Sequence, residues 1–286
     1  MGQSEIVVLK ASGDKEPFSE EKVRHSIRRA RIPHKLEDEV VRHIRQALYN
    51  GIPTSEIYRH ISEYLGNSSY PYTRTVYGLK QAIMQLGPSG YPFEKFVAAI
   101  LAYYGYTVQT DVIVSGKCVD HEIDVVAQKD GLRYMVECKF HNLPGVRSDV
   151  KVALYTQARF EDVQQIGIDN TKPFDQAWLV TNTKCTTEAI HYGNCVGMQV
   201  VGWSHPESGN LQDLIEKAGL QPVTCLLSLT DGQKKQLLSR GVVLSRDLLE
   251  DKAGVVSGLG LTGEEKDNLM KEITAICQGE VQPPKS

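Results

Sequence analysis

The sequence predicts a multidomain α+β and α/β protein with three parts. The first is a small β-hairpin with a bundle of helices, the second a mixed sheet with helices on its faces, and the third a small all-α region. The first part has a strand-like run followed by segments in which apolar residues recur at helical spacing. The second part alternates helical and strand patterns. Between them, "QLGPSGYP" contains two glycines and two prolines and marks a domain seam. The predicted boundaries are 1–87, 88–220 and 221–286.

The N-terminal part opens with a strand, "EIVVLK", and a turn at "ASGDKE". A helix is expected from Ser19, a good N-cap that is followed by acidic residues in the first turn. Further helices are expected over about 36–49, 54–65 and 72–86, with Thr54 as a second N-cap.

The central part begins with a helix whose apolar stripe runs from Phe93 to Leu101. Strands are expected near 106–114, 120–128 and 132–140, then a helix over 148–166 with Ser148 as its N-cap. On that helix Val150, Ala153, Leu154 and Ala158 form the expected apolar stripe. A strand, a helix from Thr186 and a last strand complete an α-β-β-β-α-β-α-β order, which favours a mixed sheet.

The C-terminal part, about 223–279, is predicted to be all-helical, with Thr-led caps in "LTDGQ" and "LTGEE". Its Gly-bearing turns resemble helix-hairpin-helix modules, which offer backbone N–H groups to DNA phosphates. Its charge is near neutral, so a role in protein interaction is equally compatible. The tail "GEVQPPKS" is expected to be disordered.

Composition limits the function classes. The chain has 286 residues, of which 41% are hydrophobic and 23% charged, as in a soluble globular protein. No apolar run approaches the roughly 20 residues of a membrane helix, and "MGQSEIVVLK" lacks a signal-peptide layout, so a cytoplasmic location is expected. The net charge is −3, so any contact with nucleic acid must use local patches or metal ions.

The six cysteines include no Cys-x-x-Cys pair, so a zinc ribbon or thioredoxin-like site is not indicated. Cys185, His191 and Cys195 could meet at a metal, but reduced, partly buried thiols are the favoured interpretation.

Charged residues interrupt two strand-like runs. Asp124 lies among apolar residues, and Glu137 and Lys139 follow in the next run. Residues i and i+2 of a strand share a face, and a hairpin across "KDG" would bring Asp124 opposite them. Two converging carboxylates need a cation, and Mg²⁺ suits such a site. A nearby lysine can position an attacking water and stabilise charge on a phosphodiester. The alternative is a surface hairpin with an incidental ion pair.

The runs "EID" and "VECK" make residues 88–205 resemble the PD-(D/E)xK nuclease superfamily, and most closely its Mrr-like restriction endonucleases. The resemblance implies a restriction-endonuclease-like α/β/α core. It also implies DNA cleavage with Mg²⁺ or Mn²⁺ at Asp124 and Glu137, help from Lys139, and a role in restriction or phage defence. Glu94 matches a further acidic position of relatives. The sequence departs from many Mrr-like members at "KCVDHEID" and by Glu-Cys-Lys in place of Gln-x-Lys.

Three polar residues near the motif have two open interpretations each. Gln157 falls on the stripe of the 148–166 helix and is either a polar helper at the site or a core-edge amide. His121 and His141 flank the motif and either lie at its rim or, as favoured, face solvent.

The stretches "VVLKASGDKEPFSEEKVRHSIRRA" and "GIPTSEIYRHI" resemble the ATP-cone, the regulatory nucleotide-binding module of ribonucleotide reductases. The resemblance covers about 4–86 and implies binding of ATP or dATP. The positions carried over are Val8, Lys10, Glu16, Lys22, Thr54 and Ile57. Relatives often have Lys-Arg where this chain has Lys10-Ala11. Lysines and helix N-termini are suited to binding phosphate. The sequence contains no P-loop motif, so ATP hydrolysis is not indicated.

The expected function is therefore an endonuclease gated by ATP or dATP, in a homo-oligomer that responds to nucleotide. The alternative is a nucleotide-sensing factor that binds DNA or protein through a catalytically inert nuclease fold. For the N-terminal part alone, the alternative is a helical protein-interaction domain with a basic face formed by Arg24, Arg28, Arg29 and Arg31.

Overall fold

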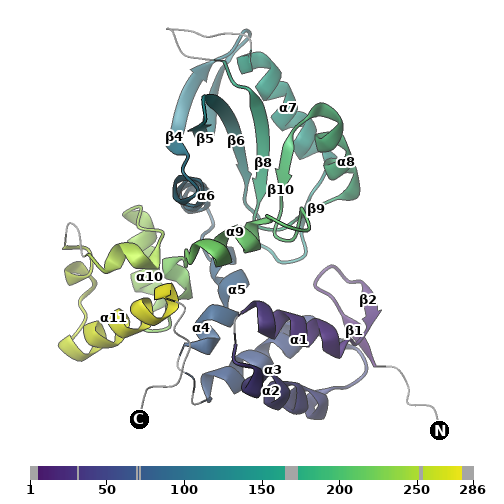
Figure 1. Cartoon of the computed structure of the whole chain (residues 1–286), viewed down its shortest axis with the longest axis vertical. Helices are drawn as coiled ribbons and strands as arrows, with labels where there is room; N and C mark the ends of the chain where they lie inside the picture. The colour runs from purple at the N-terminus through teal and green to yellow at the C-terminus, as the bar shows by residue number, and fades with distance from the viewer. Residues whose placement is uncertain are drawn as a thin grey trace. The chain divides into compact units, whose positions relative to one another are not determined.

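The computed structural model describes residues 6–30, 32–68, 70, 72–164, 173–250 and 254–278. These form two compact units (Figure 1). One contains the chain up to Ala82 together with Gln221–Gln236 and the residues from Ser245 onward. The other contains Ile83–Leu220 and Leu237–Leu244. The predicted tail at 279–286 and the expected end of the 148–166 helix lie outside the described residues.

The first unit opens with a small sheet in the order β2-β1-β3. Strand β1 (Val7–Leu9) pairs antiparallel with β2 (Lys15–Pro17) and parallel with β3 (Ile52–Pro53). The hairpin between β1 and β2 turns at Gly13, whose φ of +84° suits glycine. This arrangement confirms the predicted hairpin and adds the short strand β3, which is too brief to show a pattern.

Helices pack beside this sheet around a core of branched apolar residues. Their bounds are α1 (Glu20–Arg29), α2 (His34–Ala47), α3 (Thr54–Gly66) and α4 (Thr73–Tyr77). Helix α5 (Leu79–Met84) follows, and its residues from Ile83 onward belong to the second unit. The Ser19 hydroxyl caps α1 by accepting from the Lys22 N–H, as predicted. Thr54 is not an N-cap, because it is already the first residue of α3. The single helix expected over 72–86 is divided at Gly78.

The second unit is built on a five-stranded sheet in the order β10-β8-β6-β5-β4. The strands are β4 (Thr107–Ser115), β5 (Asp120–Lys129), β6 (Leu132–Lys139), β8 (Gln176–Thr181) and β10 (Gln199–Val201). The first three pair antiparallel, whereas β6, β8 and β10 are parallel. Asp130 and Gly131 form the β5–β6 turn with φ of +52° and +81°, the signature of a type I′ hairpin.

Helices cover both faces of this sheet. Figure 1 shows α6 (Tyr91–Tyr103) on one side and α7 (Val150–Gln164) and α8 (Thr187–Val196) on the other. Helix α9 (Leu211–Ala218) and the short parallel pair β7 (Arg147–Ser148) and β9 (Lys184–Cys185) complete the unit. The mixed sheet between helices confirms the predicted fold class.

Helix α7 differs from its prediction in two details. Its first N–H groups, from Lys151 and Val152, are accepted by Asp149; Ser148 belongs to β7 and does not cap the helix. The buried face of α7 is also rotated from the expected stripe, because Leu154 and Ala158 are exposed. The buried residues are Ala153, Thr156, Gln157, Arg159, Phe160 and Val163.

The C-terminal region is all-helical, as predicted. Its elements are η2 (Val223–Cys225), α10 (Asp231–Ser239), η3 (Ser245–Leu248), η5 (Ser257–Leu259) and α11 (Gly263–Gln278). Thr230 and Thr262 cap α10 and α11 by accepting from the N–H groups of Gln233 and Glu265.

A buried carboxylate ties this region to the N-terminal helices within the first unit. Glu272 of α11 is 1% exposed. It accepts hydrogen bonds from the N–H groups of Leu227 and Ser228, from the Ser228 hydroxyl, and from the hydroxyl of Thr75 in α4.

Candidate functional sites

The nuclease-like residues gather where β5 and β6 lie side by side. Val125 pairs with Val136, so the next positions along the ladder bring Asp124 opposite Glu137. The Asp124 Oδ2 accepts the backbone N–H of Cys138 at 2.7 Å. The hairpin therefore brings together the two carboxylates that the sequence singled out.

Electrostatics show that a third carboxylate belongs to this group. Burial, and then the negative charge of Asp124, raise the pKa of Glu94 in α6 to about 7. The same two causes raise the pKa of Glu137 to about 7. Burial also raises the pKa of Asp124. Desolvated carboxylates that repel one another favour either protonation or a bound cation.

Asp111 is a fourth member that sequence reasoning missed. The pairs Thr110↔Val125 and Val112↔Ile123 flank it, so it lies opposite Asp124 on β4. Its φ of +55° is unusual for a non-glycine residue inside a strand. Its charge contributes to raising the pKa values of Glu94 and Asp124. Asp111 interrupts an apolar run just as Asp124 does, and that signal could have identified it.

Lys139 is exposed at the end of β6, two residues after Glu137. Its positive charge lowers the pKa of Glu137, against the larger effects that raise it. The expected proximity of Glu137 and Lys139 is thus observed.

A buried arginine enters the site from α7 and was also missed. Arg159 forms an ion pair with the Glu137 Oε2 and donates to the backbone carbonyl of Glu122. Its positive charge also acts on Asp124, where it lowers the pKa against the effect of burial. The rotation of the α7 face concealed this residue, because the expected stripe placed position 159 toward solvent.

Gln157 is buried, but its amide donates to Glu161 of the same helix at 3.0 Å. Both histidines are half-buried and have polar partners, so neither faces solvent as freely as the favoured interpretation expected. The His121 Nε2 lies 2.8 Å from Asp162, and the His141 Nε2 lies 2.9 Å from the Ser148 hydroxyl.

In the described part of the chain, no three His, Cys, Asp or Glu side chains converge so that they could hold a metal ion. Cys185, His191 and Cys195 likewise do not gather into such a group among these residues. All six cysteines are free thiols. In the nuclease-like group, Asp124 and Glu137 form a pair of candidate ligands, with Glu94 and Asp111 near enough to influence the group electrostatically.

Three of the expected nucleotide-binding residues meet in the first unit. The Glu16 carboxylate contacts the Nζ atoms of Lys10 and Lys22 at 2.6 and 2.9 Å. These hydrogen bonds lower the pKa of Glu16. Leu9 pairs with Pro53, so Lys10 and Thr54 leave adjacent strands side by side. The backbone of Lys10 thereby lies beside the start of α3, while Val8 and Ile57 are buried.

A pocket of about 540 Å³ lies elsewhere in this unit, between α2 and α3. None of the expected nucleotide-binding residues lines it. Its lining residues are Lys35, Leu36, Glu39, His43, His60, Glu63, Tyr64, Asn67, Ser68 and Tyr70.

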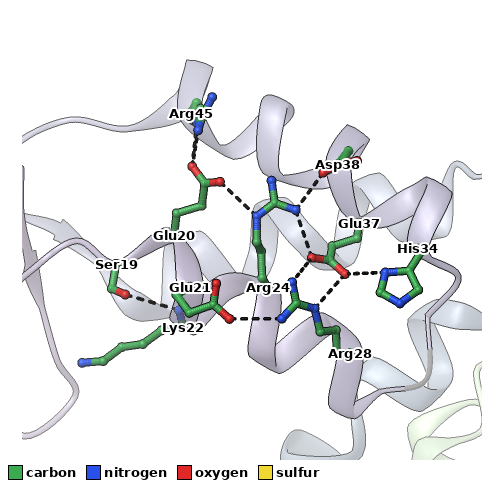
Figure 2. Close-up of polar contacts among 10 residues, drawn as sticks. All are labelled: Ser19, Glu20, Glu21, Lys22, Arg24, Arg28, His34, Glu37, Asp38 and Arg45. Atoms are coloured by element: carbon green, nitrogen blue, oxygen red, sulfur yellow. Dashed lines mark hydrogen bonds and ion pairs between the residues drawn. The ribbon is translucent and has the colours of Figure 1, made fainter.

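The expected basic face of α1 is instead a network of ion pairs, shown in Figure 2. Glu37 is buried with a side chain 3% exposed and accepts from both Arg24 and Arg28. Arg24 also contacts Glu20 and Asp38. The arginines are therefore largely neutralised within the fold. Arg31, which was expected on this face, lies outside the described residues.

Three known families match successive stretches of the chain. Residues 6–78 match the ATP cone domain, residues 87–203 match a family described as restriction endonuclease, and residues 222–277 match "AF1548-like, C-terminal". Among the described residues, none of the helices has both the length and the apolar character needed to cross a membrane.

Two individual proteins extend these matches. An uncharacterized protein of Archaeoglobus fulgidus is 41% identical over 180 residues, which cover 63% of this chain and 99% of the relative. The crystal structure of a protein of unknown function, AF1548, has a TM-score of 0.56 and 39% identity. That match covers 67% of this chain and all of the solved chain. The chain therefore belongs to the family of this archaeal protein, with an ATP cone, a restriction-endonuclease domain and an AF1548-like C-terminal domain.

Proposed function

We propose that the chain is a metal-dependent DNA endonuclease whose cleavage is regulated by ATP or dATP bound to the N-terminal ATP cone. The observation that carries this proposal is the group of partly buried carboxylates on β5, β6 and α6. Their raised pKa values reflect burial and mutual repulsion, and a divalent cation relieves both. The match of residues 87–203 to restriction endonucleases supports the same reading.

The donor set fits Mg²⁺ or Mn²⁺, which prefer carboxylate oxygens and retain several waters. Asp124 and Glu137 would hold the ion, and Glu94 is near enough to interact electrostatically with both carboxylates. A bound ion supplies Lewis-acid stabilisation of the phosphoryl oxygens and lowers the pKa of its water.

The remaining roles belong to side chains of the protein. Lys139 is exposed beside Glu137, where its ammonium can orient an attacking water and stabilise charge that develops on the phosphodiester. The hydrogen bond from the Cys138 N–H fixes the Asp124 carboxylate, so one of its oxygens remains for the ion.

The proposed control of cleavage by nucleotide rests on two neighbouring lysines, Lys10 and Lys22. Lys10 and Lys22 share Glu16 as their anionic partner, and the phosphates of a nucleotide offer the lysines additional charge. Nucleotide can control cleavage only if it favours one arrangement of the protein over another. We expect this arrangement to be a homo-oligomer. Light scattering of the full chain with and without ATP tests that expectation, since an unchanged mass and cleavage rate would contradict gating.

A plasmid-cleavage assay tests the proposed activity. The full chain should nick supercoiled DNA in Mg²⁺ or Mn²⁺ and lose this activity in EDTA. Asp124→Asn and Glu137→Gln should both be inactive, because each removes a candidate metal ligand. Substitution of exposed Lys151 of α7 by Ala is the matched control and should leave cleavage intact. Contaminating nuclease would be revealed if the two acidic-site variants cleaved as well as the unmodified chain.

One observation favours a second candidate, in which the nuclease fold binds DNA or a protein partner without cleaving. Glu137 is occupied by Arg159, and within the described residues no third ligand joins it and Asp124. This candidate predicts DNA retention in a gel-shift assay with no cleavage in any metal.

A further inference from the structure

Arg159 is the buried cation of the nuclease site. Its side chain is 10% exposed, and it reaches from α7 to the Glu137 carboxylate on β6 and the Glu122 carbonyl on β5. Its guanidinium carbon lies 5.3 Å from the centre of the Tyr155 ring on the same helix. Among the described residues, its Nε atom is buried with no hydrogen-bond partner. The guanidinium is therefore held mainly by one carboxylate and one carbonyl.

In the metal-free protein, Arg159 neutralises carboxylate charge that a bound metal ion would otherwise neutralise. Glu94, Asp111, Asp124 and Glu137 concentrate negative charge in a partly buried space, and such a cluster is costly without a counter-ion. Lys139 is exposed, whereas Arg159 directly contacts one of the acids. In the absence of metal, Arg159 supplies the neutralising charge.

The same contact opposes metal entry. One oxygen of Asp124 is taken by the Cys138 N–H and one oxygen of Glu137 by Arg159. A divalent ion bound between these carboxylates would lie beside the guanidinium. Two neighbouring positive charges repel strongly in a poorly solvated site. The contact also holds Glu137 in a position where no three-ligand set forms among the described residues.

We propose that Arg159 is a resident counter-ion that competes with the divalent metal for Glu137, so that metal binding requires the guanidinium to release this carboxylate. The proposal rests on the proposed function, because it concerns the same metal site. It makes Arg159 a positioning residue whose contact with Glu137 belongs to the metal-free state. A residue that only oriented Glu137 for the metal would have the opposite effect on metal affinity.

The experiment measures Mn²⁺ binding to the full chain by calorimetry, without DNA or nucleotide. Arg159→Gln should bind Mn²⁺ about tenfold more tightly or better, because a unit charge beside the divalent ion is removed. The same variant should melt at a lower temperature than the unmodified chain in EDTA, because the acids lose their counter-ion. Arg159→Lys keeps the charge and should bind Mn²⁺ nearly as the unmodified chain does. Lys151→Gln makes the same charge change on an exposed part of α7 and is the control.

Opposite shifts of metal affinity and metal-free stability would support the proposal. Unchanged or weaker Mn²⁺ binding by Arg159→Gln would overturn it. If this variant does not fold in EDTA, restoration of folding by Mn²⁺ would support competition, and failure of Mn²⁺ to restore it would contradict competition.

Asp124→Asn identifies the site and should abolish Mn²⁺ binding both in the unmodified chain and in Arg159→Gln. If neither the unmodified chain nor Arg159→Gln binds Mn²⁺, the metal-dependent function itself fails along with the proposal. If the unmodified chain binds Mn²⁺ tightly and Arg159→Gln does not bind it more tightly, only the proposed role of Arg159 fails.

Discussion

The protonation of Glu137 connects the stability of the protein with the proposed metal binding. Its pKa is about 7 in the folded chain, against an ordinary value of 4.5. Between these values the folded state retains a proton that the unfolded state has lost. This group therefore makes the metal-free protein less stable as pH rises from 4.5 to about 7.

Metal binding should show the opposite dependence on pH, because the ion requires ionised carboxylates. Mn²⁺ affinity is expected to rise with pH up to about 7 and then to level. Melting curves in EDTA and in Mn²⁺ across this range measure both trends. Glu137→Gln should reduce the slope of the metal-free trend but not abolish it, because the pKa of Glu94 is also raised to about 7. An identical slope in that variant would show that groups other than Glu137 control the trend.

Asp111 offers a test that separates charge from backbone conformation. Asparagine tolerates a positive φ and lacks the carboxylate charge, so Asp111→Asn should raise metal-free stability by on the order of 0.5–1 kcal/mol. Asp111→Val should lower stability by about 1–3 kcal/mol, because a β-branched residue is strained at this φ. Urea denaturation measures both changes. Equal stabilities of the two variants would argue against a constrained backbone at position 111.

At the scale of elements, the sequence predicted the strands that carry the site more accurately than the helix that covers it. The apolar runs of β5 and β6 and the "KDG" turn between them predicted the register that brings Asp124 opposite Glu137. The buried face of α7 is harder to predict from the sequence, because the helix buries Thr156, Gln157 and Arg159 while it exposes Leu154. Hydrophobic periodicity cannot identify a face whose buried members are polar, so Arg159 escaped prediction.

The N-terminal elements show a related limit. The motif located Lys10, Glu16 and Lys22, but counting positive charges on α1 predicted a free basic face. That face is neutralised by Glu37 and Asp38 of α2, which are distant in sequence from Arg24. Charge patterns along one helix do not reveal the partners that a neighbouring helix supplies.

Nucleotide binding can be tested on the hairpin and α1. ATP or dATP at a hundredfold excess over its dissociation constant should stabilise the full chain by about 2.7 kcal/mol. The double variant Lys10→Ala/Lys22→Ala should lose most of the resulting rise in melting temperature. Lys35→Ala changes a lysine at the pocket between α2 and α3 and should retain it. Loss of the shift in Lys35→Ala alone would relocate the nucleotide to that pocket.

At the scale of the molecule, Glu272 joins the C-terminal region to α4 of the ATP cone within one unit. Its carboxylate accepts four hydrogen bonds while buried. Glu272→Ala should therefore lower the free energy of unfolding by about 3 kcal/mol, because several buried donors lose their partner. Chemical denaturation checks this value. Glu264→Ala, an exposed change in the first turn of the same helix, is the control. A loss below about 0.5 kcal/mol in Glu272→Ala, in the range of ordinary surface substitutions, would contradict a structural role for this contact.

The fold class was predictable because each part has its own local pattern, and three family models match successive stretches of the chain. The association of the C-terminal region with the N-terminal helices was not predictable. It depends on Thr75 and Glu272, which are separated by 197 positions, and neither residue carries a local signal of that pairing.

Cleavage by a Lys139 variant is the most direct test of the proposed nuclease chemistry. Lys139 is exposed and contributes no core packing, so Lys139→Met should fold and bind Mn²⁺ like the unmodified chain. Its rate of plasmid nicking in Mg²⁺ should nevertheless fall by at least about 100-fold, because charge stabilisation at the phosphodiester is lost. Nicking by the unmodified chain that requires Mg²⁺ and is lost in this variant is the expected result. Equal nicking rates for Lys139→Met and the unmodified chain would contradict catalysis at this site.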